Sequence, residues 1–269
     1  VSYFTSLMYF PTFYPVNREF YNSLATGTFG TSPETVLSNG AFKLESYEPA
    51  TLSFSLVKNP DYYDADKVKL AGLNYQVIKD SQTALLSYQN GDLDVVTLSG
   101  DQVELVQDDP EFTTMNAGYL WYVTVNQAQY PDLANVNFRK ALSAAFDRDA
   151  IATAIVKDGS TPATFAVPSG FCIGPDGTDF RGTDNVYEGS DKAKAAEYFK
   201  AACEELGLTS FNLTLLVEDN ATAQDVAAFI QQEWTSTLPG VQVELKVETK
   251  KQRVQDIQDG NYNVCLTRW

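Results

Sequence analysis

Acidic side chains are the groups in this sequence that could most readily do chemistry, because the chain has 35 Asp and Glu residues and no His. Without His, neither a Ser-His-Asp or Cys-His nucleophile nor a His-ligated zinc centre can be built. Asp92 and Asp94 have the spacing with which a strand presents two carboxylates on one face. A carboxylate-based hydrolase, such as a glycosidase, therefore stays open as one interpretation.

Oxygen ligands for a hard cation are concentrated in residues 174–179 and at Asp184. These oxygens would suit Ca²⁺, but the run lacks the EF-hand spacing, and turn formation explains its Gly, Pro and Asp content well. The sequence contains no C-x-x-C pair and no glycine-rich phosphate loop. We expect no metal site and no cofactor.

The net charge of −16 argues against two classes of partner. Nucleic-acid binding needs clustered Lys and Arg, and direct docking on anionic lipid is equally disfavoured. With 269 residues, of which 44% are hydrophobic, the chain can bury one large core or two medium ones.

The elements that must position these side chains divide into two sets. The first part is rich in strands, predicted from alternating hydrophobicity, with Asn39-Gly40 as a turn signal and a hairpin across Glu48-Pro49. A change of composition near residues 116–118 is the expected boundary or hinge. The elements predicted before it are strands over 41–47, 51–57, 73–78 and 93–96, and helices over 81–89, with Ser81 as N-cap, and 101–106.

The second part alternates strands and helices, which predicts an α/β unit with helices packed on a sheet. Asn137 and Ser190 are the expected N-caps of two of its helices. The predicted strands are 119–125, 211–217, 241–247 and 262–266, the predicted helices are 138–157, 191–206, 222–238 and 250–258, and a loop fills 162–189.

Several segments occur in order along nearly the whole chain, namely 39–44 through 58–63, 77–80 with 84–85, 90–94, 125–126, 138–148, 192–193 with Gly207, and 262–264 ending at Trp269. Together they resemble the extracellular solute-binding proteins, family 5, which serve oligopeptide and dipeptide ABC importers. The resemblance implies an α/β, periplasmic-binding-protein-like type II fold with two lobes, mixed sheets and flanking helices, incomplete in this chain. Residues 90–94 match a structural turn of the family, which favours a structural role for Asp92 and Asp94.

This resemblance also implies how the chain maps onto the family. Residues 1–118 would form part of the first lobe, and residues 119–269 most of the second, truncated at its C-terminal end. Members are usually longer, so we expect a fragment. The family's acidic residue that holds a peptide's amino terminus falls just after the equivalent of Trp269.

The function implied is that of a substrate-binding component of an ABC importer. It would capture peptides outside the membrane by hinge closure, as a monomer, and deliver them to permease and ATPase subunits. The implied location is extracellular or periplasmic, held at the cell surface by a lipid anchor outside this segment. No enzymatic activity is expected.

Six residues are candidates for the ligand cleft. Tyr119 and Trp121 share one face of a predicted strand, and Arg268 could bind a ligand carboxylate in a bidentate pair. By the resemblance, Trp121 and Trp269 match cleft-lining positions, while Glu218 and Lys250 lie on loops that border the ligand; relatives often have a small residue at Arg268.

A plainer role is open for each of these six residues. Trp121 could be a core residue, Tyr119 a hinge anchor, and Trp269 exposed simply because the chain stops. The three charged side chains could be solvated surface groups.

An alternative within the same fold is a receptor for another solute. Abundant aromatic side chains would suit an oligosaccharide, whereas nickel binding often recruits His, which is absent. Competition between peptides and oligosaccharides would separate these functions.

Overall fold

The computed structural model describes residues 2–115, 117–181 and 189–269, and it divides by contacts into two units, 1–78 and 79–269. This division falls earlier than the boundary expected near residues 116–118, because the segment 79–115 groups with the second unit. The assignment of residues 1–118 and 119–269 to two lobes stays a prediction.

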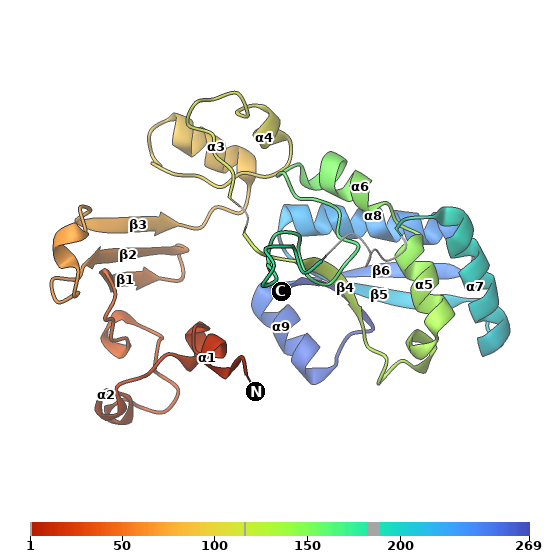
Figure 1. The fold of residues 1–269 in the computed structure, drawn as a ribbon, viewed down its shortest axis with the longest axis horizontal. Helices are drawn as coiled ribbons and strands as arrows, with labels where there is room; N and C mark the ends of the chain where they lie inside the picture. The colour runs from red at the N-terminus through yellow and green to blue at the C-terminus, as the bar shows by residue number, and fades with distance from the viewer. Residues whose placement is uncertain (1, 116, 182–188) are drawn as a thin grey trace. The chain divides into compact units, whose positions relative to one another are not determined.

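The first unit is built on an antiparallel sheet in the order β1–β2–β3, as the alternating sequence predicts (Figure 1). Cross-strand pairs hold it together, and the rings of Phe54 and Tyr75 stack with centroids 4.4 Å apart. Its strands are β1 (Phe42–Glu48), β2 (Ser53–Lys58) and β3 (Gly72–Gln76), and its helices are α1 (Phe4–Leu7), η1 (Pro11–Phe13), α2 (Arg18–Ser23), η2 (Pro33–Thr35) and η3 (Ala65–Lys67).

The second unit begins with α3 (Ser81–Gln89) and α4 (Asp101–Glu104). The N-cap of α3 is Asp80, not Ser81, because the Asp80 side chain accepts a hydrogen bond from the backbone N–H of Thr83. The strand expected over 93–96 was wrong: that segment is irregular and no described strand pairs with it. Four residues of mixed polarity carry too weak a pattern to require a strand.

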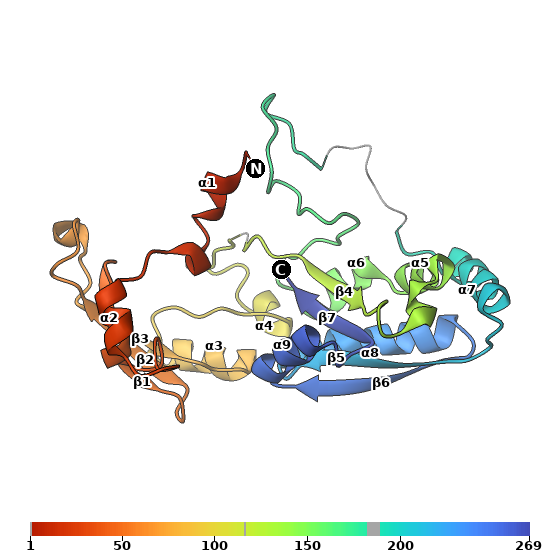
Figure 2. The same cartoon turned by 90° about the horizontal axis from the view of Figure 1, so that it is seen from below.

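The main sheet of the second unit has the order β4–β7–β5–β6 (Figure 2). The strand β5 lies parallel to both β6 and β7, whereas β4 lies antiparallel to β7. The strands are β4 (Trp121–Val125), β5 (Phe211–Glu218), β6 (Val241–Glu248) and β7 (Val264–Arg268). The carboxyl ends of β5, β6 and β7 and the amino end of β4 consequently lie at the same end of the sheet.

Helices flank this sheet, with α8 (Ala221–Thr237) packed along β5 and β6, and α5 (Val136–Ala144) packed on α7 (Lys192–Leu206). The short helix α9 (Lys250–Asp259) follows β6, and η4 (Pro131–Ala134) precedes α5. The N-cap of α7 is Asp191 rather than Ser190, and Gly207 closes the helix in a left-handed conformation at φ 66°.

The long helix expected over 138–157 was wrong, because the segment is broken into three. The first helix, α5, is capped by Asn135 instead of Asn137. Asp147 then caps a new start, α6 (Arg148–Ala150), which runs into the π-helix η5 (Ile151–Val156). An Asp side chain competes well for free backbone N–H groups, so it can begin a new helix within a continuous apolar pattern.

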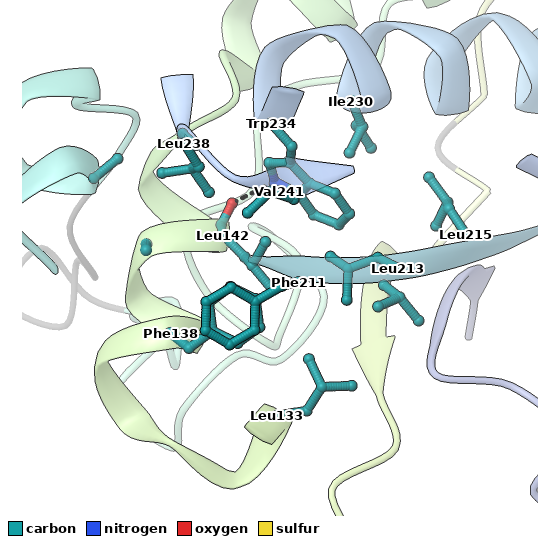
Figure 3. Close-up of a cluster of buried hydrophobic side chains, with 14 of the residues drawn as sticks. Leu133, Phe138, Leu142, Phe211, Leu213, Leu215, Ile230, Trp234, Leu238 and Val241 are labelled. Atoms are coloured by element: carbon teal, nitrogen blue, oxygen red, sulfur yellow. Dashed lines mark hydrogen bonds between the residues drawn. The ribbon is translucent and has the colours of Figure 1, made fainter. Parts of the chain in front are cut away.

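The core of the second unit lies between the sheet and its helices (Figure 3). Trp234 is 1% exposed, and its indole N–H donates to the backbone oxygen of Leu142 at 2.8 Å, which satisfies both buried polar groups. Phe138 and Phe211 pack with ring centroids 4.3 Å apart. This packing fixes the sheet whose strand ends carry the candidate site.

Candidate ligand-binding site

The candidate residues come together at the end of the sheet where the parallel strands finish. Glu218 ends β5, Arg268 ends β7, and Trp121 begins the antiparallel β4 directly opposite Arg268. Lys250 begins α9 just past β6, and Tyr119 and Trp269 flank β4 and β7. Ligands of α/β proteins bind outside the carboxyl ends of the strands, so the structure gathers these residues at a chemically suitable edge.

The guanidinium of Arg268 lies over two aromatic rings. Its Cζ atom is 4.8 Å from the ring centroid of Tyr119 and 5.1 Å from that of Trp121. Both are within the range of a cation–π interaction, and a guanidinium stacked in this way keeps its N–H groups available for a carboxylate. The geometry therefore presents one oriented cation on an aromatic platform.

Trp121 and Tyr119 are surface residues at this edge, with 43% and 56% of their surfaces exposed. This exposure argues against a core role for Trp121. Tyr119 lies just outside β4, so the strand begins two residues later than the alternation suggests. Both rings contact the same guanidinium, which agrees with the expectation that they share a face.

Trp269 continues the ladder between β4 and β7 through its backbone. Its N–H donates to the Leu120 oxygen at 3.0 Å, and its own oxygen accepts from the Leu120 N–H at 2.8 Å. The Trp269 residue is 81% exposed. A large aromatic surface therefore stands beside the Arg268 platform and faces solvent in this chain.

Glu218 is occupied by an internal ion pair. Its Oε2 atom accepts from Nη2 of Arg253 at 3.2 Å, and Nη1 of the same guanidinium donates to Oγ1 of Thr267 at 2.6 Å. Arg253 is 4% exposed, so it needs this counter-charge. Glu218 is accordingly a partner of a buried cation at the strand ends, and its charge is largely neutralised there.

A second ion-paired cluster lies at the end of β6. Lys246 contacts Asp256 at 2.6 Å and Glu248 at 3.0 Å. The pKa of Asp256 is lowered mainly by the hydrogen bond from Lys246 and secondly by that from Gln252. The pKa of Lys246 is raised mainly by its hydrogen bond to Asp256 and secondly by that to Glu248. The lowered pKa means that the Asp256 carboxylate is held ionised by its nearby cation.

Lys246 and Arg253 are ion-paired cations, whereas Lys250 and Arg268 form no ion pair within the described ranges. Lys250 is exposed at the first position of α9, where Thr249 caps the helix through its Oγ1. The carboxylates of Glu218, Glu248 and Asp256 are already paired. The strand ends therefore carry two available cations in a chain whose net charge is −16.

Sequence reasoning missed Arg253 and Thr267. Within α9 the apolar Val254 is 39% exposed, whereas the charged Arg253 and Asp256 are buried. A charged pair one turn apart on the buried face was the available signal. Its meaning depended on partners that only the folded sheet brings close.

The carboxylates considered for catalysis or for Ca²⁺ binding do not form a site among the described residues. Asp92 and Asp94 are exposed and lie in an irregular segment, so no strand presents them as a pair. Asp176 accepts from Thr178, and Asp179 accepts from the backbone N–H groups of Gly170 and Arg181; these hydrogen bonds lower the pKa of each carboxyl.

Both Asp176 and Asp179 therefore organise their own loop. In the described part of the chain, no cluster of three potential metal-ligating His, Cys, Asp or Glu residues occurs, and Asp184 lies outside it. Among the described helices, none has the length and apolar character needed to span a bilayer.

The family to which the chain belongs is established by its sequence. Residues 2–269 match the model of the bacterial extracellular solute-binding proteins, family 5 (middle region), and the chain belongs to this family. It is 33% identical to the dipeptide-binding protein of Lactococcus lactis, over 99% of this chain and 50% of that protein. It is 28% identical to the oligopeptide-binding protein OppA of Bacillus subtilis, over 99% and 49%.

Solved structures agree with this assignment. The structure of Listeria monocytogenes OppA bound to peptide matches with a TM-score of 0.92 and 31% identity, over 100% of this chain and 53% of that one. The predicted fold class, an α/β periplasmic-binding-protein-like type II fold with mixed sheets, is therefore confirmed. The chain spans about half the length of the curated relatives it matches.

Proposed function

We propose that this chain is part of the substrate-binding component of an ABC importer that captures peptides outside the membrane. The observation that carries the proposal is the cation on its aromatic platform, Arg268 over Tyr119 and Trp121, at the carboxyl ends of the strands. The family and the names of the most similar relatives support a peptide as the solute.

Capture would depend on backbone and side-chain contacts together. A bound peptide must pair its N–H and C=O groups once water leaves, and strand edges and loops can supply these partners for any sequence. Arg268 would bind a ligand carboxylate through paired N–H groups, while Trp121, Tyr119 and Trp269 would line tolerant side-chain pockets. Lys250 would add a second positive charge at the rim, and Glu218 would border the ligand while paired to Arg253.

Closure of two lobes would follow, with residues 1–118 in the first and 119–269 in the second. Ligand favours the closed state because it makes more contacts there than in the open state. The closed receptor would then deliver its peptide to permease and ATPase subunits. We propose that it acts as a monomer, without enzymatic activity, outside the cell or in the periplasm, where a lipid anchor holds it at the surface.

The platform is tested by removing its cation in the longest natural polypeptide that contains residues 1–269. Arg268→Gln should weaken the binding of an equimolar pool of tripeptides with free carboxyl termini by about tenfold, the loss of one charge-assisted pair. Lys251→Gln, an exposed cation of α9, is the matched control and should leave binding unchanged. Equal affinities of the two variants would remove Arg268 from the site.

An oligosaccharide is the second candidate solute, and the exposed rings of Tyr119 and Trp121 favour it specifically. Sugars stack on aromatic faces and need no carboxylate partner, so Arg268→Gln should then have little effect. Competition decides between the two: displacement of a fluorescent peptide by the tripeptide pool but not by maltooligosaccharides supports a peptide receptor. The reverse pattern supports the sugar receptor.

A further inference from the structure

A set of polar contacts joins the segment 79–104 to the part of the chain after residue 118. We call this set the clasp, and it consists of the contacts of Lys79, Ser99, Gly100, Asp101 and Glu104 with Val156, Lys157, Asp219 and Thr222. The contacts fall into two groups, one at the end of η5 and one where β5 leads into α8.

The first group is centred on Lys157. Its ammonium lies 2.6 Å from Oδ1 of Asp101 and 3.2 Å from Oε1 of Glu104. Lys157 ends the π-helix η5 in a left-handed conformation at φ 49°, which costs a non-glycine residue free energy. π-Helical turns are rare and occur often at functional positions, so this strained turn is an unusual place to hold an ion pair.

The backbone beside Lys157 takes part as well. The Val156 oxygen, left free by the end of the helix, accepts from the N–H of Gly100 at 2.8 Å. Gly100 has φ 67° and ψ −151°, a conformation essentially restricted to glycine. The segment 99–101 therefore relies on the conformational freedom of Gly100 to deliver one N–H and one carboxylate to the same turn.

The second group lies where β5 leads into α8. Lys79 Nζ contacts Oδ2 of Asp219 at 2.9 Å. The hydroxyl of Ser99 lies 3.3 Å from that of Thr222 in the first turn of α8, and it also bonds to the hydroxyl of Ser81 at 3.1 Å. Ser99 of this second group directly precedes Gly100 and Asp101 of the first group, so the two groups are adjacent along the segment 79–104.

The character of these contacts is that of a reversible interface. They are hydrogen bonds and ion pairs, and the side chains contributed by the segment 79–104 to the ion pairs keep solvent exposure: 79% for Asp101, 60% for Glu104 and 57% for Lys79. Their partners Lys157 and Asp219 are less exposed, at 23% and 32%. Interfaces that open and close within a chain are more polar than permanent cores. The core of the second unit, by contrast, is formed by apolar residues outside this segment.

We propose that the clasp is a closure latch, which joins the first lobe to the second in the closed state and opens when the lobes separate. This inference rests on the proposed function and its lobe boundary at residues 118 and 119. It explains why the segment 79–115 groups by contacts with the second unit although it precedes that boundary. The latch touches none of the candidate ligand residues, so it sets the closure equilibrium independently of ligand contacts.

The latch has a measurable consequence, because apparent affinity equals intrinsic affinity multiplied by the closed, competent fraction. An exposed ion pair contributes modestly, so its loss should lower that fraction, and hence the affinity, about two- to fivefold. Salt should have a similar effect on the wild type, since it screens exposed charges.

The test uses the longest natural polypeptide that contains residues 1–269, with Lys157→Gln and the conservative Asp101→Asn as latch variants. Lys200→Gln, an exposed cation of α7, is the matched control. Without ligand, both latch variants should raise the radius of gyration measured by small-angle X-ray scattering and speed hydrogen exchange of the Gly100 amide two- to fivefold. The control should change neither.

A tripeptide pool then provides the second readout. Both latch variants should bind the pool two- to fivefold more weakly than wild type. Because Lys157 also pairs with Glu104, a double variant should be no weaker than Lys157→Gln alone. Unchanged scattering and exchange in Asp101→Asn would overturn the latch, even if wild type binds peptides. Failure of wild type to bind peptides, with the scattering change intact, would overturn the proposed function and leave the latch standing.

Discussion

Trp121 and Arg268 occupy directly opposed positions on β4 and β7, and the guanidinium of Arg268 lies 5.1 Å from the centroid of the Trp121 ring. Opposed residues on one face of an antiparallel pair have side chains close enough to interact, so the register itself builds the contact. The register continues to Val125 opposite Val264, next to the buried core. The core thereby positions a cation and its aromatic partner at the open end of the sheet.

Replacing Trp121 tests whether that platform binds ligand. Trp121→Ala removes an exposed aromatic surface and one partner of Arg268, so peptide affinity should fall about tenfold or more. Tyr122→Ala alters the next residue, which points to the other face of the strand, and should change affinity less than twofold. Titration calorimetry on the longest natural polypeptide gives both values, and equal values would exclude Trp121 from the site.

Trp234 should dominate the stability of the second unit. Trp234→Phe removes the indole N–H and leaves the buried Leu142 oxygen without a partner, which costs about 1–3 kcal/mol. Trp269→Phe changes a residue that is 81% exposed and should alter the free energy of unfolding by less than about 0.5 kcal/mol. Urea denaturation measures both, and similar losses would contradict the packing described.

Acid should destabilise the protein partly through Asp256. Its pKa is lower in the folded chain than in the unfolded chain because of Lys246 and Gln252, so the unfolded state binds the proton first as pH falls. The contribution is present above the ordinary Asp pKa of about 4 and is lost as pH falls through the folded value.

Asp256→Asn should therefore flatten the loss of unfolding free energy between about pH 5 and pH 3. The exposed Asp259→Asn, whose carboxylate accepts only from Gln255 among the described contacts, is the control and should keep the wild-type slope. Denaturant titrations across this range supply the comparison, and identical slopes for the two variants would speak against the Lys246–Asp256 pair.

The cysteines should differ sharply in reactivity. Burial raises the pKa of the Cys265 thiol to about 11, and the residue is 0% exposed, whereas Cys172 lies exposed in a loop. Only the thiolate reacts, so a thiol reagent at pH 8 should modify Cys172 rapidly and Cys265 only after unfolding. Mass spectrometry of peptides after timed labelling reads this directly, and early modification of Cys265 would contradict its placement in β7.

The sequence was sufficient for those features in which local pattern and tertiary structure agree. Alternation in β1, β2 and β6 and the helical spacing of α8 predicted elements that the fold confirms. The sequence pattern failed for the long helix over 138–157. The helical spacing of hydrophobic residues continues through Asp147, but the backbone helix ends before it and a new helix begins after it. Asp147 is a good N-cap residue and could have signalled a new helix start, but the continuous hydrophobic spacing favoured one long helix.

For the site, the sequence predicted that Tyr119 and Trp121 share one face, and both rings do contact the Arg268 guanidinium. That Arg268 would lie over these rings was not predicted, and the binding of ligand by these residues stays a prediction. The occupation of Glu218 by Arg253 could not be predicted, since the pair joins the end of β5 to the buried face of α9. Burial of an arginine is disfavoured until its counter-ion is known. The clasp could likewise not be predicted from the sequence, because its ion pairs connect segments that are far apart along the chain.

The measurement that tests the central claim most directly is titration calorimetry of the longest natural polypeptide containing residues 1–269 against the tripeptide pool, beside a maltooligosaccharide pool. We predict saturable binding of peptides, weakened about tenfold by Arg268→Gln and unaffected by Lys251→Gln, and no heat from the sugars. Absence of peptide binding, together with binding of the sugars, would contradict the assignment of this chain to a peptide receptor.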